Sequence, residues 1–71
     1  MKIVRRDLDR NDHPLREHAL LVQVSSQEEG ESYLRDQVLR GFDSHGFDQL
    51  RNCWWGRHDN GDQISRFFIE P

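Results

Sequence analysis

The sequence predicts an α+β domain, a four-stranded and largely antiparallel sheet with one helix packed on one face, in the order β-β-α-β-β. Alternating apolar residues mark two pairs of strand-like runs, and between the pairs the apolar spacing changes to that of a helix. Each pair of runs encloses a turn cluster rich in Asn, Asp, Gly or Pro, which is typical of a hairpin. These patterns do not determine the strand order.

The first hairpin is predicted in residues 1–25. Residues 1–8 contain the β-prone run KIVRRDL, and residues 9–14 (DRNDHP) combine Asn, Asp and Pro in a turn cluster. Residues 15–25 form the clearest strand pattern, because their apolar side chains alternate between two faces. One face is expected to carry Leu20, Val22 and Val24, and the other Ala19, Leu21 and Gln23.

The helix is predicted from about residue 27 to residue 40. It follows the sequence SSQEE, which holds two overlapping capping boxes and places glutamates in the first turn, where the helix dipole favours them. An apolar stripe at helical spacing consists of Gly30, Leu34, Val38 and Gly41, flanked by Tyr33 and Phe42. Leu39 lies off this stripe.

The second hairpin is predicted from strands at residues 49–59 and 63–70, with residues 42–48 as a loop. Its centre is Asn60-Gly61, the preferred pair for a two-residue type I′ turn. Counting outward from that turn sets the register and places Trp54 opposite Phe67 and Trp55 opposite Arg66.

This register divides the hairpin between two faces of the sheet. The set without charge is expected to lie under the helix and comprises Leu50, Asn52, Trp54, Gly56, Ser65, Phe67 and Ile69. The other set is expected on the uncovered face and comprises Cys53, Trp55, Arg57, Ile64, Arg66 and Phe68. The predicted core consists of Val4, Leu8, Leu20, Val22, Val24, Leu34, Val38, Phe42, Leu50, Trp54, Phe67 and Ile69.

Length and composition limit the class of protein. We expect the 71 residues to form one domain, 1–71, near the lower limit for folding alone. A single cysteine fits a reducing cytoplasm better than a secreted scaffold. The start, MKIVRRDLDR, lacks the apolar run of a signal peptide, and no stretch approaches the roughly 20 apolar residues of a membrane span. A cytoplasmic protein with no membrane contact is therefore expected.

The sequence predicts no metal site, no cofactor and no enzymatic activity. The candidate metal ligands are His13, His18, His45, His58 and Cys53. They lack the paired spacing of a zinc site. Along a strand, Cys53 and His58 lie roughly 17 Å apart and on opposite faces, too far for a nucleophile and its base. The glutamates near the helix start are explained by capping.

The uncovered face is the predicted binding surface of a small protein-binding or regulatory module. An apolar patch that includes Trp and Arg is typical of an interface, either with a protein partner or with a second copy in a homodimer. The predicted partner-binding residues are Trp55, Arg57, Ile64, Arg66, Phe68 and Leu21. Three alternatives stay open. Trp55 and Arg66 form a cation–π pair that merely covers the sheet, or a single β-bulge changes the register, or single-stranded RNA or DNA stacks on the same face along a basic strip of Arg5, Arg6, Arg51, Arg57 and Arg66. The net charge of −3 argues against nucleic acid.

The size, acidity and element order resemble those of small bacterial or phage proteins. Some of these, anti-CRISPR proteins among them, act by binding a larger machine. The resemblance implies a third function, inhibition of such a machine by a protein of phage or mobile-element type.

Overall fold

The computed structural model describes residues 1–16 and 19–71. In this part of the chain, an antiparallel sheet and one helical segment confirm the α+β class, but the sheet has five strands rather than four. The strands are β1 (Lys2–Leu8), β2 (Ala19–Gln23), β3 (Ser44–Asp48), β4 (Cys53–Arg57) and β5 (Ile64–Glu70). The helical segment runs through α1 (Gln27–Tyr33), a π-helical stretch η1 (Leu34–Val38) and a 3₁₀ turn η2 (Leu39–Gly41).

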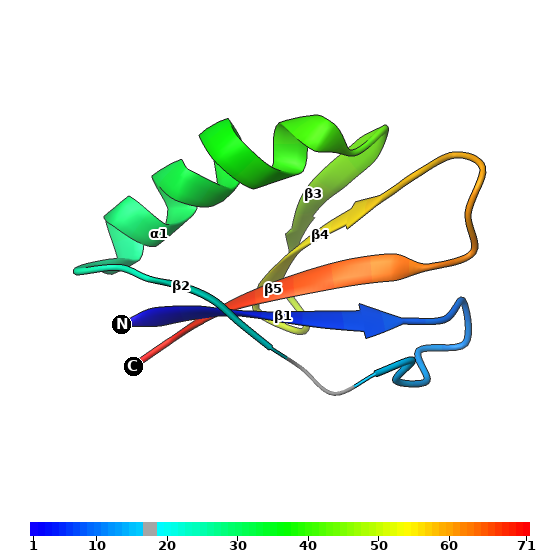
Figure 1. Cartoon of the computed structure of the whole chain (residues 1–71), viewed down its shortest axis with the longest axis horizontal. Coiled ribbons are helices and arrows are strands. Elements are labelled where there is room, and N and C mark those ends of the chain that lie inside the picture. The colour runs from blue at the N-terminus through cyan, green and yellow to red at the C-terminus, as the bar shows by residue number, and fades with distance from the viewer. Residues whose placement is uncertain (17–18) are drawn as a thin grey trace.

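The sheet order is β2-β1-β5-β4-β3, and every neighbouring pair is antiparallel. The first and last strands therefore lie side by side within the sheet, with Lys2 opposite Glu70, and the two chain ends are close together (Figure 1). The helical segment covers one face of the sheet (Figure 1). We call the other face the open face.

The additional strand, β3, lies where a loop was predicted. It pairs with β4 along its whole length, and the Phe47 ring packs edge-on against Trp54 with centroids 5.0 Å apart. Residues 49–52, predicted as strand, form the connecting turn. In that turn the Asp48 carboxylate accepts the backbone N–H of Arg51, and Asn52 takes the left-handed conformation with φ 53°.

The second strand is shorter than predicted, and residues 17 and 18 of the predicted run lie outside the described part of the chain. Val22 faces Ile3 and Leu20 faces Val4, so a bulge leaves Leu21 as an extra residue between the two pairs. Because of the bulge, Leu20 lies on the open face beside Val4, whereas strict alternation with Val22 would have placed it on the helix-covered face. Leu20 is 56% exposed, and its assignment to the core is wrong.

The predicted register of the second hairpin is confirmed, because Trp54 faces Phe67 and Trp55 faces Arg66. The predicted type I′ turn is wrong. It requires positive φ at Asn60 and Gly61, and neither residue has it. The strands end earlier, at Arg57 and Ile64, and a wider loop connects them. Because this loop is centred on the same two residues, it leaves the pairing unchanged.

The helical segment begins as predicted, with the Ser26 hydroxyl accepting the backbone N–H of Glu29 at 3.1 Å. After Tyr33 the ladder widens, and the N–H of Leu39 bonds to the carbonyl of Leu34, five residues earlier. A π-helical turn holds one more residue than an α-helical turn. Leu39 therefore lies one turn beyond Leu34 on the sheet-facing side and is 2% exposed, although its α-helical spacing placed it off the apolar stripe.

The core lies between the helical segment and the sheet. Its buried cluster comprises Ile3, Val24, Leu34, Leu39 and Phe67, with Val22, Tyr33, Val38, Phe42, Trp54 and Ile69 packed against it. The prediction of Leu50 as core is wrong, because this residue lies in the β3–β4 turn and is 89% exposed. Val4 and Leu8 are buried as predicted, but opposite Phe68 and Ile64 on the open face.

Small residues allow the close approach of the two layers. A side chain at Gly56 would place its Cβ 2.6 Å from the Phe42 ring, and one at Gly30 would place it 2.9 Å from Ile69. Among the described residues, the helical turns lack the length and apolar content that crossing a bilayer requires.

Candidate binding site on the open sheet face

The pairing builds a row of side chains across the middle of the open face. Arg6 on β1 faces Arg66 on β5, Arg66 faces Trp55 on β4, and Trp55 faces Gly46 on β3. Directly opposite residues on neighbouring strands lie on the same face of a sheet, so the Arg6, Arg66 and Trp55 side chains and the Gly46 position share the open face. A second row beside it consists of Leu8, Ile64, Arg57 and Ser44.

Trp55 is covered by its own chain. A Cβ at Gly46 would lie 3.2 Å from the indole nitrogen, so the indole packs over the backbone where β3 lacks a side chain. Trp55 is therefore half-buried, and it is not among the strongly exposed apolar residues. Sequence reasoning missed this contact because it placed residues 42–48 in a loop.

Of the other predicted partner-binding residues, Phe68 and Ile64 are half-buried and Arg57 is exposed at the end of β4. The guanidinium of Arg6 lies over the Phe68 ring, 5.4 Å from its centroid. Leu21 is exposed but stands apart from the set, because β2 is the outer strand on the far side of β1.

Arg66 is the least exposed of the set, at 8%. One of its terminal nitrogens lies 3.1 Å from the Asp48 carboxylate and 3.6 Å from the Cys53 sulfur. Its Nε forms an ion pair with the Asp12 carboxylate at 3.5 Å. This buried N–H has no hydrogen-bond acceptor among the described residues. Arg66 thus interacts with carboxylates, and the cation–π contacts in the described residues involve Arg5 and Arg6 instead.

Asp48 is the fixed anion beneath this cluster. The backbone N–H of Arg51 lowers the pKa of Asp48 most strongly, and the guanidinium groups of Arg51 and Arg66 lower it further against the opposing effect of burial. The hydrogen bonds that Arg51 donates to Asp48 and Asp12 raise the pKa of Arg51 in turn. Asp48 and Arg51 are therefore charged at neutral pH.

The turn after β1 brings a second carboxylate, that of Asp12, over the open face, and the Asp9 side chain stabilises this turn. The Asp9 carboxylate accepts the backbone N–H groups of Asn11 and His13 at 2.8 and 2.9 Å, and the His13 bond is the main cause of its lowered pKa. Asp12 adopts φ 67°, a left-handed conformation that Asp tolerates, and its side chain reaches Arg51 at 2.8 Å. Pro14 then returns alongside Leu8.

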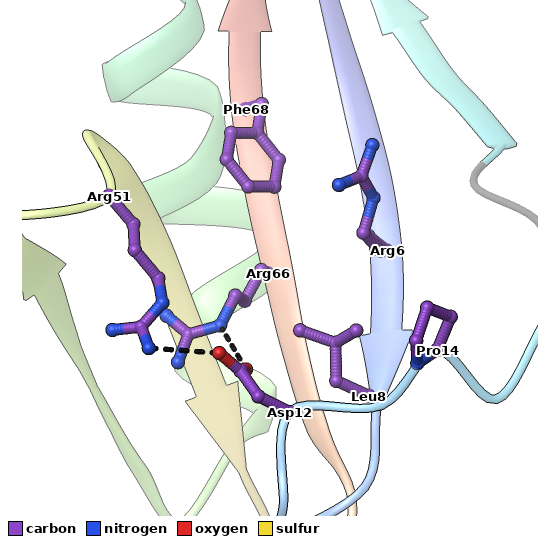
Figure 2. A pocket seen from close by; sticks show the side chains of 7 residues that line it. All are labelled: Arg6, Leu8, Asp12, Pro14, Arg51, Arg66 and Phe68. Carbon is purple, nitrogen blue, oxygen red and sulfur yellow. Dashed lines mark hydrogen bonds and ion pairs between the residues drawn. The ribbon is translucent and has the colours of Figure 1, made fainter.

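These groups surround a cavity of about 360 Å³ on the open face (Figure 2). Its residues come from β1, β5 and two loops, and they are Arg6, Leu8, Asp12, Pro14, Arg51, Arg66 and Phe68. Figure 2 shows dashed lines from the Asp12 carboxylate to the guanidinium groups of both Arg51 and Arg66. Three guanidinium groups meet two carboxylates, Asp12 and the underlying Asp48, so the site has a formal charge of +1.

Sequence reasoning placed Arg66 and Phe68 on this face and grouped Arg6 and Arg51 with Arg66 as a basic strip for nucleic acid, but it predicted neither the position of Asp12 nor a cavity. Arg51 is 39 residues from Asp12 in the sequence, and these groups meet only because β1 and β5 pair and two loops fold over them. The one available signal was the Asp and Asn content of residues 9–12, which predicts a tight turn but not its direction.

A second polar cluster lies on the helix side, at the edge of the core. Burial raises the pKa of Asp7, but hydrogen bonds from Ser65 and Arg5 and the charges of Arg5 and Arg16 outweigh it, so this pKa is lowered. Ser65 and Asp7 are buried and satisfy each other, which is a structural role.

The described residues contain no group of three or more His, Cys, Asp or Glu side chains that could hold a metal ion. Cys53 is buried beneath Arg66. Comparisons with protein-family models, with curated proteins and with solved structures give no match.

Proposed function

We propose that this protein is a non-enzymatic binding module that holds a segment of a partner protein on its open face. The observation that supports this proposal best is the cavity in which Arg6, Arg51 and Arg66 surround an apolar floor of Phe68, Leu8 and Pro14. Arginine beside aromatic surface is the composition that dominates the energetics of protein interfaces.

The charge distribution favours a foreign partner over a second copy. The open face carries Arg6, Arg57 and Arg66 with Arg51 at its rim, four arginines against the two carboxylates of Asp12 and Asp48, whereas Glu28 and Glu29 lie on the helix side. In a sheet-on-sheet homodimer two arginine-rich faces would meet, and like charges across an interface oppose association. An acidic segment of another protein complements this face.

The carboxylates of the open face favour protein over nucleic acid. Of the two aromatic side chains on which a base would stack, Phe68 already has the guanidinium of Arg6 over its ring, 5.4 Å from the centroid. In addition, Asp12 and Asp48 place carboxylates in the middle of the surface where phosphates would have to bind.

The proposal is tested by selecting peptides from a displayed random library on the immobilised chain. Selected peptides are then measured against the charge reversal Arg6→Glu and the matched reversal Arg40→Glu, which changes an exposed arginine on the helical segment. We expect a family of related peptides whose affinity falls at least about tenfold in Arg6→Glu and stays within twofold in Arg40→Glu.

Three outcomes contradict the proposal. The library yields no related peptides, or both reversals weaken binding equally, or single-stranded RNA or DNA binds in an Arg6-dependent manner and peptides do not. Light scattering measures the oligomeric state in solution. If the wild type is a dimer and Arg6→Glu is a monomer, the open face binds a second copy of the chain and not a foreign protein.

A further inference from the structure

We infer that the arginine cavity is a carboxylate-binding site in which Asp12 occupies the place of an acidic side chain of the ligand. The inference rests on the proposed function and specifies the chemistry of the partner, an exposed glutamate or aspartate flanked by apolar residues. Three features of the cavity lead to it: the position of Asp12, the incomplete hydrogen bonding of Arg66, and the apolar floor.

Asp12 binds where an anionic ligand would bind. Its two oxygens reach guanidinium groups from different elements, one to Arg51 at 2.8 Å and the other to Arg66 at 3.5 Å. Asp48 holds the same two arginines from the sheet side, at 3.0 and 3.1 Å, and is anchored further by the Arg51 backbone N–H. Asp48 is therefore a permanent part of the cluster, whereas Asp12 reaches it from an exposed loop.

The contact of Asp12 with Arg66 is imperfect. The Nε of Arg66 is buried and lies 3.5 Å from the Asp12 carboxylate, but its N–H has no hydrogen-bond partner in the described residues. Leaving a buried charged donor without an acceptor is unfavourable. A carboxylate that enters freely can approach this N–H in the coplanar geometry that arginine prefers, which the short side chain of Asp12 does not reach from its loop.

The rest of the cavity favours a carboxylate next to an apolar group. Arg6 forms no ion pair within the described residues, and once Asp12 leaves, the guanidinium groups of Arg6, Arg51 and Arg66 face Asp48 alone. Phe68, Leu8 and Pro14 offer an apolar surface beside these guanidinium groups. A phosphate would meet the Asp48 carboxylate and has no apolar part to place on this surface, whereas a carboxylate flanked by apolar residues contacts both the arginines and the apolar surface.

Displacing Asp12 exchanges one ion pair for another. Asp12 is in the left-handed conformation, on an exposed turn, and its release into water carries little desolvation cost. The turn thus acts as an internal competitor. A site that is free only part of the time shows an affinity reduced by that fraction, so removing the competitor tightens binding.

The test uses two capped tripeptides, acetyl-Leu-Glu-Leu-amide and acetyl-Leu-Gln-Leu-amide, and inorganic phosphate as a third probe. Binding is followed in the ¹⁵N-labelled chain by NMR, through the Nε–Hε signals of Arg6, Arg51 and Arg66. We expect saturable shifts of the Arg51 and Arg66 signals with the Glu peptide, and at least about tenfold weaker effects with the Gln peptide and with phosphate.

The decisive variant is Asp12→Asn, because Asn tolerates the left-handed conformation of the turn and removes only the charge. We expect it to bind the Glu peptide about tenfold more tightly than the wild type. The matched control, Asp62→Asn, removes an exposed aspartate paired with Arg10 outside the cavity and leaves the affinity within twofold. The thermal midpoints of both variants verify that the fold is retained.

Equal binding of the Glu and Gln peptides, an unchanged affinity in Asp12→Asn, or stronger effects of phosphate than of the Glu peptide would each overturn the inference. Its failure is distinguishable from that of the proposed function. If the Glu peptide binds but the library yields no family of related peptides, the protein-binding function is refuted and the carboxylate site is retained. If the library yields a family of peptides without acidic residues, the carboxylate site is refuted and the protein-binding function is retained.

Discussion

Gly56 provides the sharpest test of the packing between the helical segment and the sheet. In Gly56→Ala the new Cβ would lie 2.6, 2.7 and 3.0 Å from three carbons of the Phe42 ring. The ring has to retreat by roughly 1 Å to restore ordinary van der Waals contact. Its movement is restricted, because it stacks on His58 with centroids 4.8 Å apart and meets Phe67 edge-on at 6.1 Å.

The magnitude follows from two opposing contributions. Overpacking of a core costs about 1–3 kcal/mol, and alanine offsets about 0.4–1 kcal/mol of this by restricting the unfolded chain. We therefore expect Gly56→Ala to lower the free energy of unfolding by about 1–2 kcal/mol. In a domain of this size that corresponds to a fall in Tm of about 5–15 °C.

The assay is urea and thermal unfolding followed by circular dichroism. The control is Gly41→Ala, since nothing lies within 4 Å of its Cβ position. The clash is attributed to Phe42 by a double-mutant cycle, in which Phe42→Ala removes most of the cost of Gly56→Ala. A change below about 0.5 kcal/mol in Gly56→Ala, or an undiminished cost in the Phe42→Ala background, would refute the proposed packing.

Three further outcomes follow from the structure. Because Leu39 is buried and Leu50 is exposed, Leu39→Ala is expected to lower the free energy of unfolding by about 2–4 kcal/mol and Leu50→Ala by less than about 0.5 kcal/mol. Similar losses for the two variants in urea unfolding would contradict the burial of Leu39 by the π-helical turn. The pKa of Asp7 lies below its ordinary value of 3.8 despite burial, so its stabilisation is present above that pH and is lost as the pH falls through the folded-state pKa. Asp7→Asn should therefore be less stable than the wild type at pH 7 and lose less stability on acidification; parallel unfolding curves from pH 7 to pH 2 would refute this. Gly46→Ala should displace the Trp55 indole and change the tryptophan fluorescence of the folded protein, and an unchanged spectrum would show that the indole does not pack on β3.

The second hairpin shows what the sequence was sufficient to predict. Its register depends only on where the loop is centred, and both a two-residue turn and the wider loop are centred between Asn60 and Gly61. The incorrect type I′ turn therefore still gave the correct pairing of Trp54 with Phe67. The same reasoning correctly assigned Gly56 to the helix-covered face, because a face with large apolar groups needs a small residue where a layer approaches.

Two of the errors have a common physical cause, which is one extra residue in a hydrogen-bonded ladder. The bulge at Leu21 moves Leu20 from the predicted core to the open face, and the π-helical turn brings Leu39 into the core. Strict periods of 2 and 3.6 do not predict either change. β3 was missed for another reason, since Ser, Gly and Asp have low strand propensity and this strand depends on its pairing with β4.

The predicted binding surface was correct in its register but incomplete in its chemistry. Arg66 was predicted opposite Trp55 without a carboxylate partner, because neither Asp12 nor Asp48 lies near it in the sequence. In the structure Asp48 lies 18 residues from it along the chain, and Asp12 reaches it across the sheet. An arginine held by two carboxylates, one anchored and one on an exposed loop, is a site whose second carboxylate can be exchanged. The partner-binding hypothesis thereby gains a chemical requirement that the sequence did not supply: the ligand has to replace Asp12.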